Sequence, residues 1–297
     1  MRKESLADRA TVAGFTIVCA LFGLMCLTPL WVALVASFSN EYALIRSGYQ
    51  IWINQLDFTS YRLIFSGSDD VLRAYGVTIL TTALGVGTTL FLTALTAFPL
   101  SLRSMRYRGA ISFFAYFTML FNGGLVPNYI LTVRFLHLKN NLLVLIIPAA
   151  LNAYNLFLMR NYFQTLPESL AESAKIDGAG DFRIFRSIAL PLAKPILATI
   201  GLFAAMGYWN EWYRVLLYID RRSMFTLQFL IMKLQQQVDF LSSSMNPQAR
   251  QSLGNIPIPT IGIRLATAMV SIGPIVLLYP FLQRYFIGGI LIGSVKG

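Results

Sequence analysis

The residues best suited to bind a polar ligand lie in the stretch GYWNEWY, residues 207–213, within an otherwise apolar part of the chain. Asn210 and Glu211 supply an amide and a carboxylate, and Tyr208 supplies a hydroxyl among aromatic rings. In a membrane protein such a polar pair usually faces a cavity, whereas aromatic rings at the membrane interface need no ligand to explain them. We therefore predict that Tyr208, Asn210 and Glu211 line a ligand route, with an aromatic belt as the alternative for the rings.

Helix-breaking and amide residues in two other apolar stretches are further candidates for this route. A glycine pair after an asparagine, followed by Pro127, should break or bend its helix. Breaks at membrane depth are tolerated where they face protein or water rather than lipid. Gating or helix packing would explain these residues equally well. The candidates are Asn122, Gly123, Gly124, Asn152 and Asn155.

No motif for energy-coupled chemistry is present in the chain itself. It contains no nucleotide-binding loop of the form G-x-x-x-x-G-K-[ST], and GVGTTL (85–90) lacks the lysine. Carriers driven by protons or sodium usually show intramembrane acids, whereas Glu211 is the only acid inside the long apolar stretches. If the chain moves a ligand across a membrane, this pattern favours ATP hydrolysis on a partner protein. A stand-alone secondary carrier or channel is the alternative.

The elements that must position these residues are membrane-spanning helices. Of the 297 residues, 56% are hydrophobic and 12% are charged, whereas an ordinary soluble domain has about 25% charged residues. A helix that crosses a bilayer needs roughly 20 mostly apolar residues. The predicted fold is therefore an all-α membrane protein with six transmembrane helices. The six stretches are 12–38, 76–102, 110–133, 142–163, 195–219 and 265–282.

Metal and nucleic-acid sites are not expected. Cys19 and Cys26 are seven residues apart in one apolar run, which separates them by about 10 Å along a helix axis and is too far for a disulfide. The net charge of +11 does not gather in a basic patch on a soluble face, which nucleic-acid binding would need. Cytoplasmic loops of membrane proteins account for such an excess of lysine and arginine.

Lysine and arginine near the span ends predict the orientation. Arg2, Lys3 and Arg9 precede the first stretch, and the connection RSMRYRG (103–109) has three arginines and no acid. Both segments therefore belong in the cytoplasm, which also makes the segment 164–194 and both termini cytoplasmic. The predicted outer segments are 39–75, 134–141 and 220–264.

The cytoplasmic segment has signals for a helical hairpin at about residues 166–191. Pro167 suits the first turn of a helix, and Asp177-Gly178 ends it because glycine tolerates the left-handed conformation. Asp181 can then cap a second helix.

The second helix of this hairpin should be amphipathic. Phe182, Phe185 and Ala189 are predicted to share one face, and Leu190-Pro191 should stop the helix. The hairpin either rests on lipid headgroups or packs on its own spans and presents its bend to another protein.

The same residues resemble a known family. ABC-importer permeases have an EAA loop pattern, E-A-A-x3-G-x9-I-x-L-P. This chain matches it at the same spacing with Glu172-Ser173-Ala174, Gly178, Ile188 and Leu190-Pro191. Ser173 is the one departure from it. Five further stretches are similar to the carbohydrate-type permeases, in particular their oligosaccharide subgroup. They are FNGGLVPNYIL (121–131), YNLFLMRNYF (154–163), GYWNEWY, YPFLQRYFIGG and the terminal GSVKG.

The resemblance implies a fold, a function and partners. The fold is that of a type I ABC importer permease, with a first helix and outer loop (1–75) and a five-helix core (76–297). The function is that of a translocation subunit, not an enzyme, in the bacterial cytoplasmic (inner) membrane. Its partners are a homologous second permease, two ATPase subunits that bind ATP and Mg, and an extracytoplasmic solute-binding protein. The chain itself is expected to bind no cofactor.

Particular roles follow from the resemblance. Glu172 is expected to meet a basic residue of the ATPase, and Gly178 to let the bend fit a groove on it. The complete set of coupling residues is Glu172, Ser173, Ala174, Asp177, Gly178, Ala179, Leu190 and Pro191. The tail residues Ser294, Val295, Lys296 and Gly297 are expected to reach between the ATPases.

The charge of the predicted outer segments bears on the substrate. There are three bases against four acids in 39–75, two bases and no acid in 134–141, and six bases against two acids in 214–264. A basic outer face favours an acidic oligosaccharide, such as a uronide, or an acidic binding protein. The alternative is that long outer loops escape the positive-inside rule.

Overall fold

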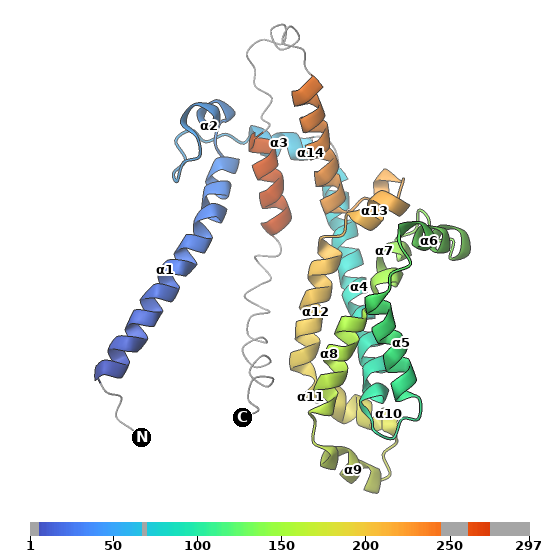
Figure 1. The fold of residues 1–297 in the computed structure, drawn as a ribbon. Coiled ribbons are helices and arrows are strands. Elements are labelled where there is room, and N and C mark those ends of the chain that lie inside the picture. Colours follow the sequence, from blue (N-terminus) through green and yellow to red (C-terminus); the bar gives the residue numbers. More distant parts are fainter. Residues whose placement is uncertain (1–5, 67–69, 245–260, 274–297) are drawn as a thin grey trace. The chain divides into compact units, whose positions relative to one another are not determined.

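The computed structural model describes residues 6–66, 70–244 and 261–273, and these residues form helices and their connections (Figure 1). No strand forms within the described residues, where one isolated antiparallel bridge joins Ser39 and Leu56. The helical part of the predicted fold class is confirmed. The number of transmembrane helices and the cytoplasmic termini stay predictions, and residues 294–297 lie outside the described residues.

The internal contacts of the chain divide it into two compact units. Of the described residues, 6–66, 233–244 and 261–273 belong to the first unit, and 70–232 belong to the second. The predicted division after residue 75 stays a prediction.

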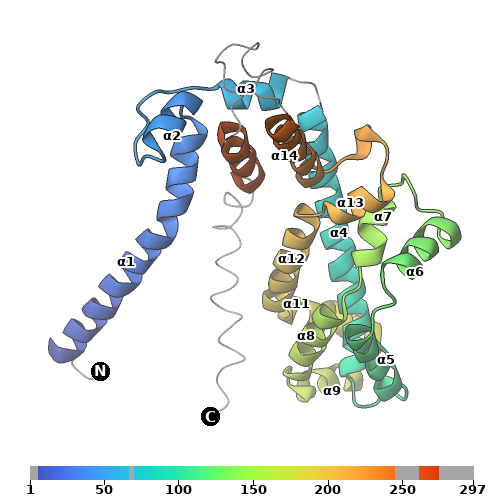
Figure 2. The same ribbon diagram turned by 45° about the horizontal axis from the view of Figure 1, so that its top comes forward.

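The second unit is built around one long helix, α4 (Asp70–Ser101). The helices α8 (Ala153–Gln164) and α12 (Lys194–Trp209) pack along it (Figures 1 and 2). Small and β-branched residues on α4 are buried at these contacts, including Gly85, Thr93 and Ala97. Small residues let helix backbones approach closely, which is how apolar helices pack where water gives no driving force. The other helices of this unit are α5 (Arg108–Leu120), α6 (Leu125–Ile130), η1 (Leu131–Phe135), α7 (Leu143–Ile146), η2 (Ile147–Ala149), α9 (Glu168–Ile176), α10 (Asp181–Ile184), η3 (Phe185–Ala189), α11 (Leu190–Leu192), α13 (Tyr213–Tyr218) and η4 (Arg222–Met224).

Several predicted spans are bent or broken. Helix α5 and the stretch Leu125–Phe135 meet at 115° across residues 121–124, so the predicted break at Asn122-Gly123-Gly124 is confirmed. Gly124 has φ +85°, and its amide donates to the Asn122 side chain at 2.9 Å. The segments Leu143–Ala149 and Ala153–Gln164 meet at 50°.

The predicted continuous span 195–219 is wrong, because α12 ends at Trp209 and α13 begins at Tyr213. Polar side chains satisfy the backbone at both ends of this break. The Asn210 amide donates to the Met206 carbonyl at 2.9 Å, and the Glu211 carboxylate accepts from the Arg214 amide at 2.8 Å.

The first unit contains α1 (Leu6–Ser37), which exposes apolar side chains such as Phe15, Phe22 and Met25, as a lipid-facing helix would. The buried Glu41 carboxylate accepts hydrogen bonds from the amides of Ile261 and Gly262 at 3.0 and 2.9 Å, which caps the helix Ile261–Gly273. That helix covers the first part of the predicted span 265–282, and residues 274–282 lie outside the described residues. The remaining helices are α2 (Glu41–Ser47), α3 (Thr59–Ser66) and α14 (Leu227–Ser244), which begins in the second unit and ends in the first.

Candidate functional site

A cavity of about 200 Å³ in the second unit brings together four of the predicted route residues, and we call it the polar cavity. These four residues are Asn152, Asn155, Tyr208 and Glu211. The cavity is also lined by Thr89, Ala149, Phe203, Ala204, Gly207 and Arg214. Residues far apart in the sequence therefore meet around one space, because α8 and α12 both pack on α4.

Tyr208 connects three helices at this cavity. Its hydroxyl donates to the Ile146 carbonyl at 3.2 Å and lies 3.2 Å from the Thr89 hydroxyl. The residue is 3% exposed, so its ring is part of the helix packing and its hydroxyl already has partners.

The two asparagines at the start of α8 have different surroundings. The Asn152 side chain accepts from the amides of Tyr154 and Asn155 and so caps the helix, which gives it a structural role. Asn155 is 8% exposed, and its carboxamide makes no hydrogen bond to another described residue. A buried polar group without a protein partner usually bonds a water or a ligand, so Asn155 is the asparagine available to a molecule in the cavity.

Glu211 and Arg214 form an ion pair at the junction of α12 and α13. The Arg214 Nη1 atom donates to Glu211 Oε2. The Arg214 side chain is 30% exposed and the Glu211 side chain is 11% exposed. The Thr226 hydroxyl donates to the Glu211 carbonyl at 2.6 Å, which anchors the acidic residue from the following segment. Partial burial strengthens such a charged hydrogen bond relative to one on the surface.

The other predicted route residues do not line the polar cavity. Asn210 bonds the Met206 carbonyl and accepts from Gln228 at 3.4 Å, and Asn122, Gly123 and Gly124 lie in the exposed break between α5 and α6. Their route role stays a prediction.

Sequence reasoning did not identify Thr89 and Arg214. The spacing of three residues between Glu211 and Arg214, typical of a helical ion pair, could have indicated the arginine. No sequence signal links Thr89 to a residue 119 positions away.

The predicted hairpin lies at one end of the second unit, and α13 lies at the opposite end (Figures 1 and 2). Helix α9 ends at Ile176, and Gly178 has the left-handed φ of +79° that was predicted for it. The predicted cap is wrong: Gly180 caps α10, and Asp181 instead pairs with Lys175 at 3.2 Å. Pro191 also does not stop the second helix, because it lies in the first turn of α11, where its missing amide is not needed.

The second helix is held firmly in the core of the unit. Ile184, Phe185 and Ala189 are buried, and the Phe98 ring lies 5.2 Å from the Phe185 ring, centroid to centroid. Phe182 is 69% exposed, so the prediction that it shares this buried face is wrong. Ile176, on the other side of the bend, is 87% exposed. The hairpin therefore combines an anchored helix with an exposed apolar pair beside its bend.

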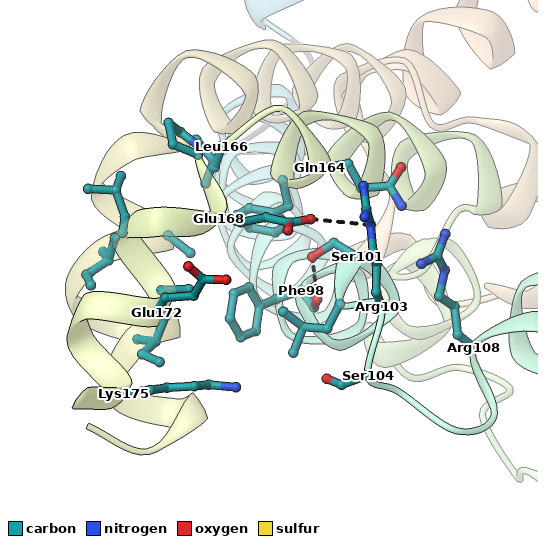
Figure 3. Close-up of a pocket in the computed structure, with 18 residues that line it drawn as sticks. Phe98, Ser101, Arg103, Ser104, Arg108, Gln164, Leu166, Glu168, Glu172 and Lys175 are labelled. Atoms are coloured by element: carbon teal, nitrogen blue, oxygen red, sulfur yellow. Dashed lines mark hydrogen bonds and ion pairs between the residues drawn. The ribbon is translucent and has the colours of Figure 1, made fainter. Parts of the chain in front are cut away.

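A larger cavity of about 550 Å³ separates the hairpin from the connection between α4 and α5, and we call it the hairpin cavity (Figure 3). Glu172 and Lys175 line it from the hairpin, Arg103 lines it from the connection, and Arg108 lines it from the start of α5. The Arg103 Nε atom lies 3.3 Å from Glu168 Oε1, which links the two sides. Both side chains of this pair are mostly exposed, so it contributes little to stability by itself.

Comparisons with known proteins agree on a family. The chain is 37% identical to the "Polygalacturonan/rhamnogalacturonan transport system permease protein YtcP" of Bacillus subtilis (strain 168), over 93% of this chain and 95% of that protein. It is 38% identical to "Protein LplC" of the same organism, over 93% and 91% of the two chains.

One solved structure is similar over almost the whole length. It is described as a bacterial ABC transporter involved in the import of the acidic polysaccharide alginate, with a TM-score of 0.78 and 30% identity, covering 96% of this chain and 100% of that one. The family model for binding-protein-dependent transport system inner membrane components matches residues 87–291. That stretch includes the hairpin with its EAA pattern and the polar cavity, and the chain therefore belongs to the family of binding-protein-dependent transport system inner membrane components.

Proposed function

We propose that this chain is the permease subunit of an ATP-driven, binding-protein-dependent importer of oligosaccharides. The observation that supports this most strongly is the hairpin, whose EAA pattern coincides with an anchored second helix and an exposed bend. A segment of this kind can transmit force because it moves with the helices on which it packs. The chain then supplies the passage, and partner ATPases bind ATP and Mg.

The hairpin offers three features to an ATPase. Ile176 and Phe182 are exposed apolar side chains on the two sides of the bend. Gly178 shapes the bend with a backbone conformation that other residues rarely adopt. Glu172 lines the hairpin cavity, where Glu168 already pairs with Arg103, so Glu172 is the carboxylate proposed to meet a basic side chain of the ATPase.

The proposed assembly contains a second, homologous permease, two ATPase subunits and a solute-binding protein at the outer face. The exposed apolar side chains of α1 and α5 support contact with membrane lipid or with the second permease, since no side chain of α5 is buried within the described residues. The tail residues 294–297 are proposed to contact the ATPases.

We further propose that the substrate is an acidic oligosaccharide of the uronate type. The names of the relatives, which refer to polygalacturonan, rhamnogalacturonan and alginate, support this, and so does the excess of bases in the predicted outer segments. Several of these bases have acidic partners, such as Lys139 with Asp220 at 3.0 Å and Arg222 with Asp70 at 2.6 Å. Pairing leaves the net charge positive, so long-range attraction of an anion persists at low salt.

The substrate proposal is tested by ATP hydrolysis in the assembled transporter with its binding protein. A galacturonate trisaccharide should stimulate hydrolysis more strongly than a matched neutral galactose trisaccharide, because only the acid is attracted by the positive outer face. Equal stimulation by the two sugars would show that charge does not select the substrate.

A further inference from the structure

The polar cavity has one base and one acid among the described residues that line it, Arg214 and Glu211. Their side chains are less than one-third exposed and neutralise each other. An ion pair removed from water is stable only where its remaining donors and acceptors find partners. The donors of Arg214 that Glu211 does not use therefore decide what else the cavity binds.

Glu211 uses only part of the hydrogen-bonding capacity of Arg214. The guanidinium group has five N–H donors in a planar fork, and one nitrogen, Nη1, donates to Glu211. The Arg214 backbone amide donates to the other carboxylate oxygen at 2.8 Å, so both ends of this carboxylate are occupied by the same residue. The remaining guanidinium donors have no acceptor among the described residues.

The geometry points to Arg214 as the specificity-determining group that binds the carboxylate of an acidic sugar on the translocation route, with Glu211 as the residue that positions it. This inference rests on the proposed function as an oligosaccharide permease. A carboxylate matches the planar fork of a guanidinium group with two parallel hydrogen bonds, which a sugar hydroxyl does not.

The neighbouring residues complete a site for a sugar ring. The unpartnered carboxamide of Asn155 can bond two hydroxyl groups, and the Phe203 side chain, 44% exposed, offers an apolar surface to the ring. These neutral groups bind acidic and neutral sugars alike. Arg214 is the group whose contribution depends on the charge of the sugar.

Two substitutions in the complete transporter test this assignment. Arg214→Gln keeps a hydrogen-bonding side chain without the charge, and Arg214→Lys keeps the charge without the fork. The measurement is ATP-driven uptake of the galacturonate trisaccharide and of the matched neutral galactose trisaccharide. We expect Arg214→Gln to reduce the ratio of the two kcat/KM values, acidic over neutral, by about 10- to 100-fold, as for loss of a hydrogen bond between charged groups. Arg214→Lys should lie between this variant and the unchanged protein.

A matched control is Arg221→Gln, which removes one base from an exposed position outside the cavity. It should leave the acidic-to-neutral ratio within about threefold, as expected for an exposed charge. If both arginine-to-glutamine variants lower the ratio equally, long-range attraction selects the sugar and the assignment of Arg214 is wrong.

An unchanged ratio in Arg214→Gln likewise overturns the assignment, while the proposed function stands as long as the unchanged protein imports either sugar with ATP. Absence of ATP-driven uptake in the unchanged protein would instead contradict the proposed function. If Arg214→Gln lowers the thermal stability of the transporter, the test rests on Arg214→Lys alone. An acidic-to-neutral ratio of kcat/KM in Arg214→Lys equal to that of the unchanged protein would then show that the guanidinium fork does not bind the sugar.

Discussion

Replacing Gly178 with valine should strongly reduce ATP-driven uptake while the chain still inserts in the membrane. Gly178 has φ +79°, a conformation that costs an L-residue roughly 1–2 kcal/mol and a β-branched one more. A Cβ atom added at Gly178 would have no atom within 4 Å outside its immediate chain neighbours. The substitution therefore disturbs the bend and not the core. A shift of the bend moves Ile176 and Phe182 relative to the ATPase, and we expect uptake to fall on the order of tenfold or more.

Two further substitutions show why the uptake falls. Gly180→Ala is the matched control, because Gly180 is in the same bend, has an ordinary φ of −71° and also has free space around it. It should retain most of the uptake. Gly178→Asn separates two causes: asparagine tolerates the left-handed conformation, so retained uptake would identify backbone shape as the requirement. Loss in both Gly178 variants would show that the partner leaves no room for a side chain, and normal uptake in Gly178→Val would exclude a coupling role for the bend.

The second large effect is expected at Gly85 of α4, which packs against the Tyr208 ring of α12. A Cβ atom at this position would lie 2.5 Å from the ring of the buried Tyr208, closer than any real contact of this kind. The ring is held by the Ile146 carbonyl and the Thr89 hydroxyl and has little freedom to move. Gly85→Ala should therefore lower the free energy of unfolding by about 1–3 kcal/mol, as overpacking does, despite the higher helix propensity of alanine.

Thermal unfolding of the purified transporter in detergent measures this effect. Gly87→Ala is the control, since Gly87 is on the same helix and a Cβ atom added to it would meet no atom within 4 Å. It should leave the unfolding temperature unchanged or raise it slightly. Combining Gly85→Ala with Tyr208→Leu should recover part of the loss, because the shorter side chain leaves the space that the new methyl group needs. A Gly85→Ala protein as stable as the Gly87→Ala protein would contradict the observed closeness of α4 and α12.

The features that sequence reasoning predicted correctly depend on local signals. The left-handed Gly178 and the break at residues 122–124 follow from residue types with strong conformational preferences. The apolar stretches 12–38 and 76–102 likewise predicted most of the long helices α1 and α4. Local preferences are sufficient for such elements because neighbouring residues alone decide them.

The features that sequence reasoning missed depend on tertiary contacts. Phe182 and Phe185 have the same residue type, yet the first is exposed and the second is buried against Phe98, a residue on a different helix. Thr89 enters the polar cavity only because α4 and α12 pack together. None of these contacts is encoded in the spacing of nearby residues.

The dependence of sugar flux on ATP and on partner subunits tests the central claim most directly. The chain is purified alone and, separately, with its second permease, ATPases and binding protein, and each preparation is reconstituted into liposomes. We predict uptake of the galacturonate trisaccharide only by the complete assembly, and only with ATP on the side of the ATPases. Sugar flux through the chain alone in liposomes without ATP would contradict the account and identify the chain as a stand-alone carrier or channel.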